Sequence, residues 1–248
     1  MLINDELFEK LSKIKFKPGG VDGSNWLISK SGIDKNKNIL EISCNTGLNA
    51  IKLAQKNGSN IYGIDMNREL IERANKNINK YGLSDLICTK TADYREIPFD
   101  DESFDIVFCE SVLIYFVNLD KEKILKECFR ILKPGGILLV HDLVVEKLDE
   151  LQLNKMRAIT NLYLYPIDRK RWIEIFKKAG FFRIEQKLGN LILFNKADLL
   201  TDEAFKSLMR IVKKEISPRS IKRFMDIRDY FDIDKRSFKY ILTAATKK

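Results

Sequence analysis

The 248-residue sequence has a single histidine, five prolines and no apolar run of about 18 residues, the length that a membrane-spanning helix needs. A membrane partner is therefore not expected. The first residues, MLINDELFEKLSK, contain acidic side chains and no long apolar stretch, so they do not resemble a secretory signal peptide. These absences favour a cytoplasmic protein with an ordinary buried core.

The four cysteines are few and widely spaced, at Cys44, Cys88, Cys109 and Cys128. None belongs to a CxxC pair or to a zinc-binding spacing. We expect reduced thiols, mostly buried, and no metal site.

Positive charge is in excess but is not concentrated. The net charge is +9, and residues 1–194, 195–236 and 237–248 each contribute +3. A nucleic-acid footprint is usually a concentrated basic stripe, so this distribution argues against a nucleic-acid partner. It is compatible with an anionic small molecule.

Short apolar runs alternate with helical patterns from residue 38 onward. Such runs are typical of strands buried on both faces of a parallel sheet. The expected strands are 38–44, 60–66, 86–93, 104–110, 136–142, 182–188 and 237–246, with 86–93 nearest an edge.

Helical spacing of apolar residues begins at Leu48 and recurs over 70–78, 124–132 and 169–182. Pro134-Gly135-Gly136 is expected to stop the third helix, and Gly180 the fourth. Two helices are expected near the start, at 4–14 and 21–31. Two more lie between residues 191 and 236. Alternation of this kind predicts a doubly wound α/β sheet.

The clearest local signal is ILEISCNTGLNAIKLA, residues 39–54. A strand ends near Glu41, a tight loop follows through Ser43 and Asn45, and a helix begins near Gly47. Ligands bind at the carboxyl ends of strands in open α/β sheets, where a helix N-terminus can face an anionic group. An adenosyl cofactor with an amino-acid tail suits such a loop.

Acidic residues end the next two strands. Asp65 can accept the ribose hydroxyls of a nucleoside. After the third strand come Ala92, Asp93 and Tyr94, where Asp93 can accept from an adenine amino group and Tyr94 or Met66 can cover the base. An isolated strand-end Asp is as often a helix cap, but three ordered signals favour one ligand site.

Together these motifs resemble a class I S-adenosylmethionine-dependent methyltransferase of the small-molecule, methyltransferase-11-like branch. The resemblance covers residues 38–190, including PFDDESFDIVFCESVLIYF (98–116) and ILKECFRILKPGGILLVHD (124–142). It implies a Rossmann-like, seven-stranded, mostly parallel sheet with an antiparallel last strand. It also implies S-adenosyl-L-methionine as cofactor and S-adenosyl-L-homocysteine as product. Cofactor contacts are then expected from Glu41, Ser43, Asn45, Gly47, Asp65, Met66, Ala92, Asp93, Tyr94 and Glu110.

The loop departs from that family at two positions. Ser43 and Asn45 stand where the family usually has glycine, and only Gly47 remains. Asn tolerates a positive φ angle better than other non-glycine residues, whereas Ser43 adds a side chain close to the expected cofactor. The variation is either tolerated or weakens cofactor binding.

Methyl transfer needs positioning, and a base only where the acceptor loses a proton. Three residues are candidates: His141, Tyr115 and Glu110. His141 is the general-base candidate, and the competing interpretation is a strand-end histidine bonded to a loop. Glu110 either contacts the methionine tail or acceptor or caps a helix. In the phosphoethanolamine branch an Asp and a His occupy the positions of Ser111 and Tyr115, so that exact activity is not expected.

The remaining expectations concern architecture and acceptor. One domain over 1–248 is divided into a helical segment (1–37), a core (38–190), a helical lid (191–236) and a final strand (237–248).

No Asn-Pro-Pro-Tyr or Asp-Pro-Pro-Tyr follows the fourth strand. That favours a small-molecule acceptor, with an RNA- or protein-modifying enzyme and a non-catalytic binder as alternatives. Both a monomer and a homodimer are compatible with the sequence. Aromatic residues such as Phe205 and Phe224, interleaved with Lys206, Arg210 and Arg223 in the lid, are candidates for the acceptor pocket.

Overall fold

The computed structural model describes residues 20–147, 149–160, 163–190 and 238–248. The expected helix at 4–14 and the lid at 191–236, with its aromatic and basic residues, lie outside this described part. Within it, no helix is long and apolar enough to cross a membrane.

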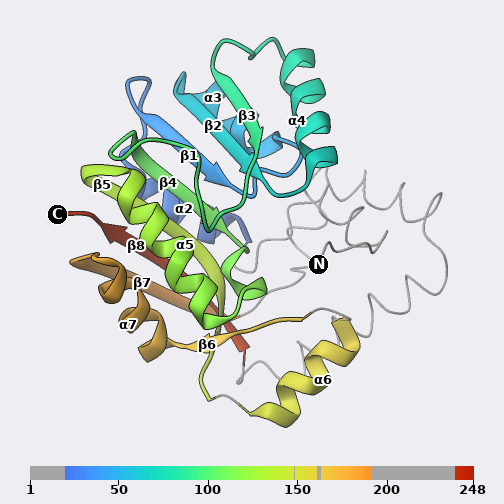
Figure 1. Cartoon of the computed structure of the whole chain (residues 1–248), viewed down its shortest axis with the longest axis vertical. Helices are drawn as coiled ribbons and strands as arrows, with labels where there is room; N and C mark the ends of the chain where they lie inside the picture. The colour runs from blue at the N-terminus through green and yellow to red at the C-terminus, as the bar shows by residue number, and fades with distance from the viewer. Residues whose placement is uncertain (1–19, 148, 161–162, 191–237) are drawn as a thin grey trace.

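The described part alternates strands and helices as the apolar pattern predicts (Figure 1). The strands are β1 (Asn38–Ile42), β2 (Asn60–Asp65), β3 (Ile87–Thr91), β4 (Phe104–Glu110), β5 (Leu132–Val145), β6 (Ile167–Asp168), β7 (Arg183–Asn190) and β8 (Phe238–Thr246). The helices are α2 (Gly20–Ser31), α3 (Leu48–Asn57), α4 (Arg68–Lys80), α5 (Asn118–Ile131), α6 (Glu150–Thr160) and α7 (Arg169–Ala179), with a 3₁₀ turn, η1 (Leu113–Tyr115).

All the strands belong to one mixed sheet of order β3-β2-β1-β4-β5-β8-β7. Strands β1 to β5 pair in parallel, whereas β8 is antiparallel to both β5 and β7. The expected seven-stranded α/β sheet with an antiparallel last strand is confirmed, and β3 is the expected edge. The two-residue β6 adds a short extension beside β5.

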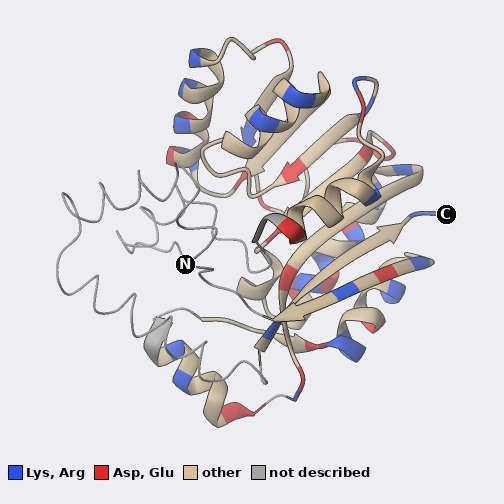
Figure 2. Cartoon of the chain, turned by 180° about the vertical axis from the view of Figure 1, so that it is seen from behind, with Lys and Arg blue, Asp and Glu red and all other residues tan. Residues whose placement is uncertain are grey.

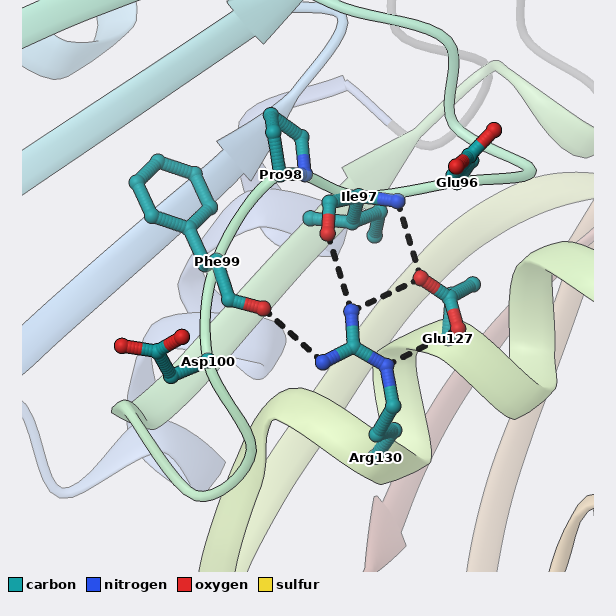
Figure 3. A pocket seen from close by; sticks show the side chains of 7 residues that line it. All are labelled: Glu96, Ile97, Pro98, Phe99, Asp100, Glu127 and Arg130. Carbon is teal, nitrogen blue, oxygen red and sulfur yellow. Dashed lines mark hydrogen bonds and ion pairs between the residues drawn. The ribbon is translucent and has the colours of Figure 1, made fainter.

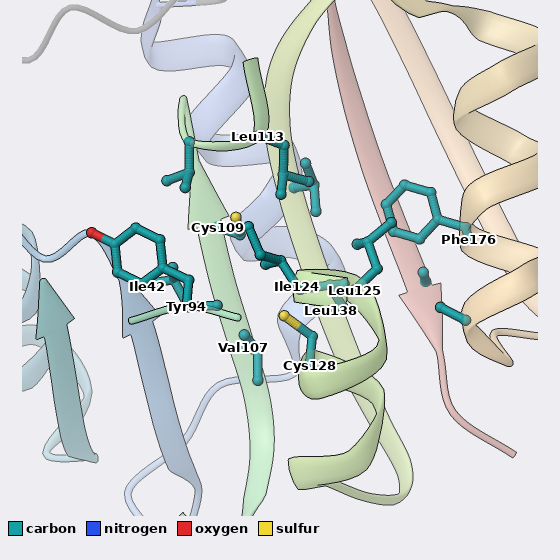
Figure 4. Packing of buried hydrophobic residues seen from close by; sticks show 14 of the residues in the cluster. Ile42, Tyr94, Val107, Cys109, Leu113, Ile124, Leu125, Cys128, Leu138 and Phe176 are labelled. Atoms are coloured by element: carbon teal, nitrogen blue, oxygen red, sulfur yellow. The ribbon is translucent and has the colours of Figure 1, made fainter. Parts of the chain in front are cut away.

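Helices cover both faces of the sheet. One face packs on α5 and α7, where Val107, Leu138 and Phe176 belong to one buried cluster (Figure 4). The other face packs on α2, α3 and α4, with Leu27, Ile51 and Ile78 in a second cluster. Because residues alternate between faces along a strand, these two clusters show which way each strand residue points.

The chain between β4 and β7 differs from the expectation in three places. Strand β5 begins at Leu132, so Pro134-Gly135-Gly136 lies inside the strand and does not separate it from α5. Gly135 adopts a φ of 76°, and the register with β4 shifts near Phe104, so the strand absorbs the turn residues as an irregularity. The turn η1 and the helix α6 were not expected either.

Gly180 ends α7 as expected. Its φ of 112° is left-handed, and a Cβ there would lie 2.8 Å from the ring of Phe129. Glycine is therefore required both for the backbone and for the packing of α7 on α5.

Candidate functional site

The carboxyl ends of the five parallel strands β1 to β5 lie along one edge of the sheet (Figure 1). In open α/β sheets, this is the edge where ligands bind. Most of the site residues expected from the sequence are at this edge, in the loops that follow β1, β2 and β3 and at the ends of β4 and β5.

The loop after β1 is a tight turn built on left-handed backbone. Ser43, Asn45 and Gly47 have φ angles of 60°, 51° and 75°. For an L-residue that conformation costs roughly 1–2 kcal/mol, and Asn tolerates it best. The Asn45 side chain compensates by accepting a hydrogen bond from the Thr46 amide at 2.7 Å. The loop is thus formed although two glycines are absent.

Asp65 ties this loop to the end of β2. Its Oδ2 accepts from the Asn45 amide at 3.0 Å, and its Oδ1 accepts from the Asn67 amide at 2.9 Å. The Ser43 hydroxyl lies 3.5 Å from Oδ2. The residue is only 4% exposed, and burial raises the pKa of its carboxyl group while these hydrogen bonds oppose the rise. Asp65 is therefore a buried, oriented acceptor at the expected ribose position.

Residues after β3 complete this part of the edge. The Ala92 amide donates to the Asp65 carbonyl at 3.0 Å, and the buried Tyr94 hydroxyl accepts from the Met66 amide at 3.3 Å. Burial raises the pKa of Tyr94, so its hydroxyl remains protonated. The Met66 side chain is exposed, as a residue that covers a base must be.

Asp93 has a partner that the sequence reasoning missed. Arg95 pairs with its carboxylate at 2.6 Å, and also contacts Asp120 at 3.4 Å. The hydrogen bond from Arg95 holds the pKa of Asp93 below its ordinary value. Arg95 is two residues from Asp93, a spacing that could have signalled the pairing in a turn. The carboxylate is stable in its ionised form and remains partly exposed.

Three ionisable side chains lie on one face of the sheet at this edge. Glu41, Glu110 and His141 follow Ile39, Phe108 and Leu139 by two residues each, so they point to the face that packs on α2 and α3. The Asn49 amide donates to Glu41 Oε1 at 2.7 Å. Glu110 and His141 are directly opposite in the register of β4 and β5.

His141 is completely buried and lies behind Glu110. Its Nδ1 is 3.8 Å from Glu110 Oε2, and its ring contacts the Tyr240 ring edge-on at a centroid distance of 5.7 Å. Gly23 of α2 lies over the ring, since a Cβ there would be 3.4 Å from His141 Cε1. Glu110 is the more accessible member of the pair, so any contact of His141 with a ligand at this edge runs through Glu110.

Tyr115 lies in the turn after β4, which is held from the opposite face of the sheet. Asp142, adjacent to His141 in β5, accepts from the Ile114 amide at 3.1 Å. Burial raises the pKa of Asp142 to about 6. The Tyr115 residue is 37% exposed, but burial of its hydroxyl and the nearby Asp142 carboxylate raise the pKa of Tyr115 to about 12. At neutral pH the Tyr115 hydroxyl stays protonated, so it can orient a ligand but cannot act as a base. The structure pairs Glu110 with His141, the other two candidates, whereas the turn that carries Tyr115 is held from the opposite face of the sheet.

Lys121, at the start of α5, was also missed. It is fully buried, and its ammonium group donates to the carbonyls of Phe116 and of Tyr165, the latter at 2.7 Å. Burial lowers its pKa to about 8. Helical spacing could have revealed this residue, because Lys121 shares the buried face of Ile124, Leu125 and Cys128. Lys121 and Asp142 together fix the turn η1.

A shallow pocket lies near the amino ends of the strands, and its residues are explained by the hydrogen bonds of Arg130 (Figure 3). Arg130 uses all five N–H donors there, including bonds to the carbonyls of Ile97 at 2.9 Å and Phe99 at 2.8 Å and to Glu127. Arg130 immediately precedes the last residue of α5, next to the amino end of β5. The pocket is therefore remote from the carboxyl edge, and its arginine holds a loop.

Some known proteins resemble this chain over nearly its whole length, and others resemble only its core. A family model described as a methyltransferase domain matches residues 40–140. An uncharacterised protein of Haemophilus influenzae is 30% identical over 246 residues, which cover 99% of this chain and 98% of that protein. The sterol 24-C-methyltransferase of Aspergillus fumigatus is 30% identical over 118 residues, 48% of this chain and 31% of that enzyme. This chain therefore spans only about a third of the sterol enzyme.

A solved structure has the same fold. Phosphoethanolamine N-methyltransferase 2 of Haemonchus contortus, in complex with phosphomonomethylethanolamine and S-adenosylhomocysteine, superimposes with a TM-score of 0.77 at 21% identity. The match covers 97% of this chain and 57% of that one.

Proposed function

The chain belongs to the class I S-adenosylmethionine-dependent methyltransferases, and we propose that it methylates a small-molecule acceptor at the carboxyl edge of its sheet. The observation that carries the proposal is the convergence at this edge of the loop after β1 with the buried carboxylates of Glu41 and Asp65 and the half-buried carboxylate of Glu110.

The donor and acceptor groups at this edge suit the cofactor. Its ribose hydroxyls and its ammonium group are hydrogen-bond donors, and its sulfonium is cationic, so oriented carboxylates match all three. In the proposal Asp65 holds the ribose, and the residues from Met66 and from Ala92 to Tyr94 surround the adenine. The loop from Glu41 through Ser43 and Asn45 to Gly47 holds the amino-acid tail.

When bound, the cofactor supplies an electrophilic methyl group on sulfur. The chain has to place the acceptor atom in line with that carbon and to exclude water. Where the acceptor carries an ionisable proton, we propose that Glu110 accepts it, with His141 behind it orienting the carboxylate. In the proposal Tyr115, in the turn after β4, contacts the acceptor and orients it.

Two observations support a small acceptor. On the side of the molecule seen in Figure 2, Lys and Arg are distributed over several helices and strands and do not gather in one basic surface. The similar proteins named above are a sterol and a phosphoethanolamine methyltransferase, whose named acceptors are small molecules. The basic residues that would bind an anionic acceptor lie in the lid, so the charge of the acceptor stays a prediction.

Calorimetry with S-adenosylhomocysteine tests the cofactor site. Asp65→Ala should weaken binding by ~1–3 kcal/mol, the value of a hydrogen bond to a charged group. Asp85→Ala changes an exposed carboxylate in the loop before β3 and is the matched control. Equal affinities of the Asp65 variant and the wild type would remove Asp65 from the site.

Radiolabelled methyl transfer tests the acceptor class. The protein is incubated with methyl-tritiated S-adenosylmethionine and, separately, with small-molecule, RNA and protein fractions of a cell extract. We expect label in the small-molecule fraction, with less label for Glu110→Gln. Label confined to RNA or protein would refute the proposed acceptor, and label in no fraction would favour a non-catalytic binder.

A further inference from the structure

We propose that Ser43 is a positioning residue whose hydroxyl holds the Asp65 carboxylate and the Tyr94 hydroxyl in place for the cofactor. The inference rests on the proposed placement of the cofactor ribose at Asp65. It gives a function to the side chain that replaces glycine in the loop after β1.

The backbone of Ser43 has a conformation that disfavours a side chain, so the presence of one needs a reason. The φ angle of 60° is one that glycine adopts without strain, and a side chain there is disfavoured. Asn45 shares this conformation, but its side chain bonds the next amide of its own loop. The side chain of Ser43 instead lies beside Asp65, at the end of β2, and Tyr94, after β3, which is what a role beyond the turn requires.

The contacts of Ser43 form a directional chain. The Met66 amide donates to the Tyr94 hydroxyl at 3.3 Å. The Ser43 oxygen lies 3.5 Å from Asp65 Oδ2, and its interaction with Tyr94 lowers the pKa of the Tyr94 hydroxyl against the effect of burial. Each hydroxyl can accept one hydrogen bond and donate one, so a Tyr94-to-Ser43 hydrogen bond would join these two contacts into one chain from the Met66 amide to the carboxylate.

This chain connects the ends of three neighbouring strands. Ser43 follows β1, Asp65 ends β2 and Tyr94 follows β3. The carboxylate of Asp65 is also fixed by the backbone amides of Asn45 and Asn67. Ser43 adds a link from a side-chain hydroxyl, and in the proposal this link couples the position of the carboxylate to that of Tyr94.

The hydroxyl also affects the charge of Asp65. Its hydrogen bond is one of those that lower the pKa of the Asp65 carboxyl group against the effect of burial. Removing the hydroxyl should therefore raise that pKa further. Cys44 and Tyr94 are titratable groups close to Asp65, Glu41 is close to Cys44, and all three are retained when only Ser43 is changed.

The test is calorimetric titration with S-adenosylhomocysteine as a function of pH. Ser43→Ala keeps the Cβ and removes the hydroxyl, whereas Ser43→Gly also relieves the backbone. We expect both variants to bind about three- to tenfold more weakly at pH 7.5. We also expect the acid pH at which binding declines to move upward. Ser103→Ala removes a hydroxyl that bonds the Asp100 carbonyl far from the site, and it should bind as the wild type does.

Tyr94→Phe breaks the next link and should weaken binding similarly, and the double variant with Ser43→Ala should bind no worse than the weaker single variant. Wild-type affinity and an unchanged pH profile in both Ser43 variants would refute the role of Ser43. If Asp65→Ala also binds as the wild type does, the proposed cofactor placement fails as well. If Asp65→Ala binds weakly while both Ser43 variants bind normally, only the present inference fails.

Discussion

Gly63 lies directly behind the loop that follows β1, and a single methyl group there should disturb both stability and cofactor binding. Gly63 is in β2, paired in register with Glu41 of β1 and Thr89 of β3. A Cβ at this position would lie 2.8 Å from Cys44 Sγ, 2.9 Å from Cys44 Cβ and 3.2 Å from Thr89 Cγ2. Distances below 3.0 Å require a neighbour to move.

The loss of stability in Gly63→Ala depends on how far the Cys44 side chain can move. Cys44 is only 3% exposed, and its amide donates to the Ile64 carbonyl at 3.0 Å. Overpacking a buried site of this kind costs about 1–3 kcal/mol. For a chain of this length we therefore expect Gly63→Ala to lower the melting temperature by roughly 2–12 °C. Because Ser43 and Asn45 flank Cys44, the affinity for S-adenosylhomocysteine should fall as well.

A second substitution shows whether the clash is the cause. Cys44→Ala removes the sulfur atom and should recover part of the stability lost in Gly63→Ala, although its Cβ remains. Urea unfolding and calorimetry are measured for the two single variants and the double variant. Additive losses in the double variant, or a wild-type melting temperature for Gly63→Ala, would show that the packing argument is wrong.

Three further outcomes are expected. Asp142 retains its proton up to a pH of about 6 in the folded chain but only to its ordinary value of 3.8 when unfolded, so unfolding free energy should fall by about 3 kcal/mol as pH rises through that window. Asp142→Asn should remove this contribution to the pH dependence of the unfolding free energy, measured by urea titrations between pH 4 and 7, and an unchanged slope would contradict the assignment. Lys121→Met leaves the half-buried carbonyls of Phe116 and Tyr165 without their cation. It should speed exchange of the Tyr165 amide hydrogen roughly tenfold, and unchanged exchange would exclude the clamp on η1. Gly189→Ala would place a Cβ 2.3 Å from the Tyr240 hydroxyl and should cost about 1–3 kcal/mol, which Tyr240→Leu should largely recover in thermal unfolding.

The sheet could be predicted because each parallel strand is a continuous apolar run. Burial on both faces requires such runs, so β1, β2 and β4 were located within one or two residues. The start of β5 was missed because Pro134-Gly135-Gly136 usually breaks structure, whereas here the strand includes it as an irregularity. The turn η1 and the helix α6 depend on tertiary contacts, such as the bond from the Ile114 amide to Asp142, that leave little periodicity in the sequence.

The order of the strands predicts which residues share the carboxyl edge of the sheet, but it does not predict which of their side chains contact one another. Asp65 and Tyr94 were expected at one edge because parallel strands end there, and the structure brings them together with Ser43. The pairing of Asp93 with Arg95 could not be deduced, because a turn conformation decides whether residues two apart meet. The distance between Glu110 and His141 likewise depends on the register of β4 and β5, which the sequence does not give.

The position of β8 has a consequence for synthesis of the protein. This strand is the last of the described strands to leave the ribosome, yet it lies between β5 and β7 and supplies the pairing partner of β7. Until it emerges, the backbone N–H and C=O groups along one edge of β5 lack their final pairing partner. Unpaired edges of this kind promote association between partly made chains. We therefore expect the incomplete chain to associate more readily than one whose last strand lies at the edge of the sheet.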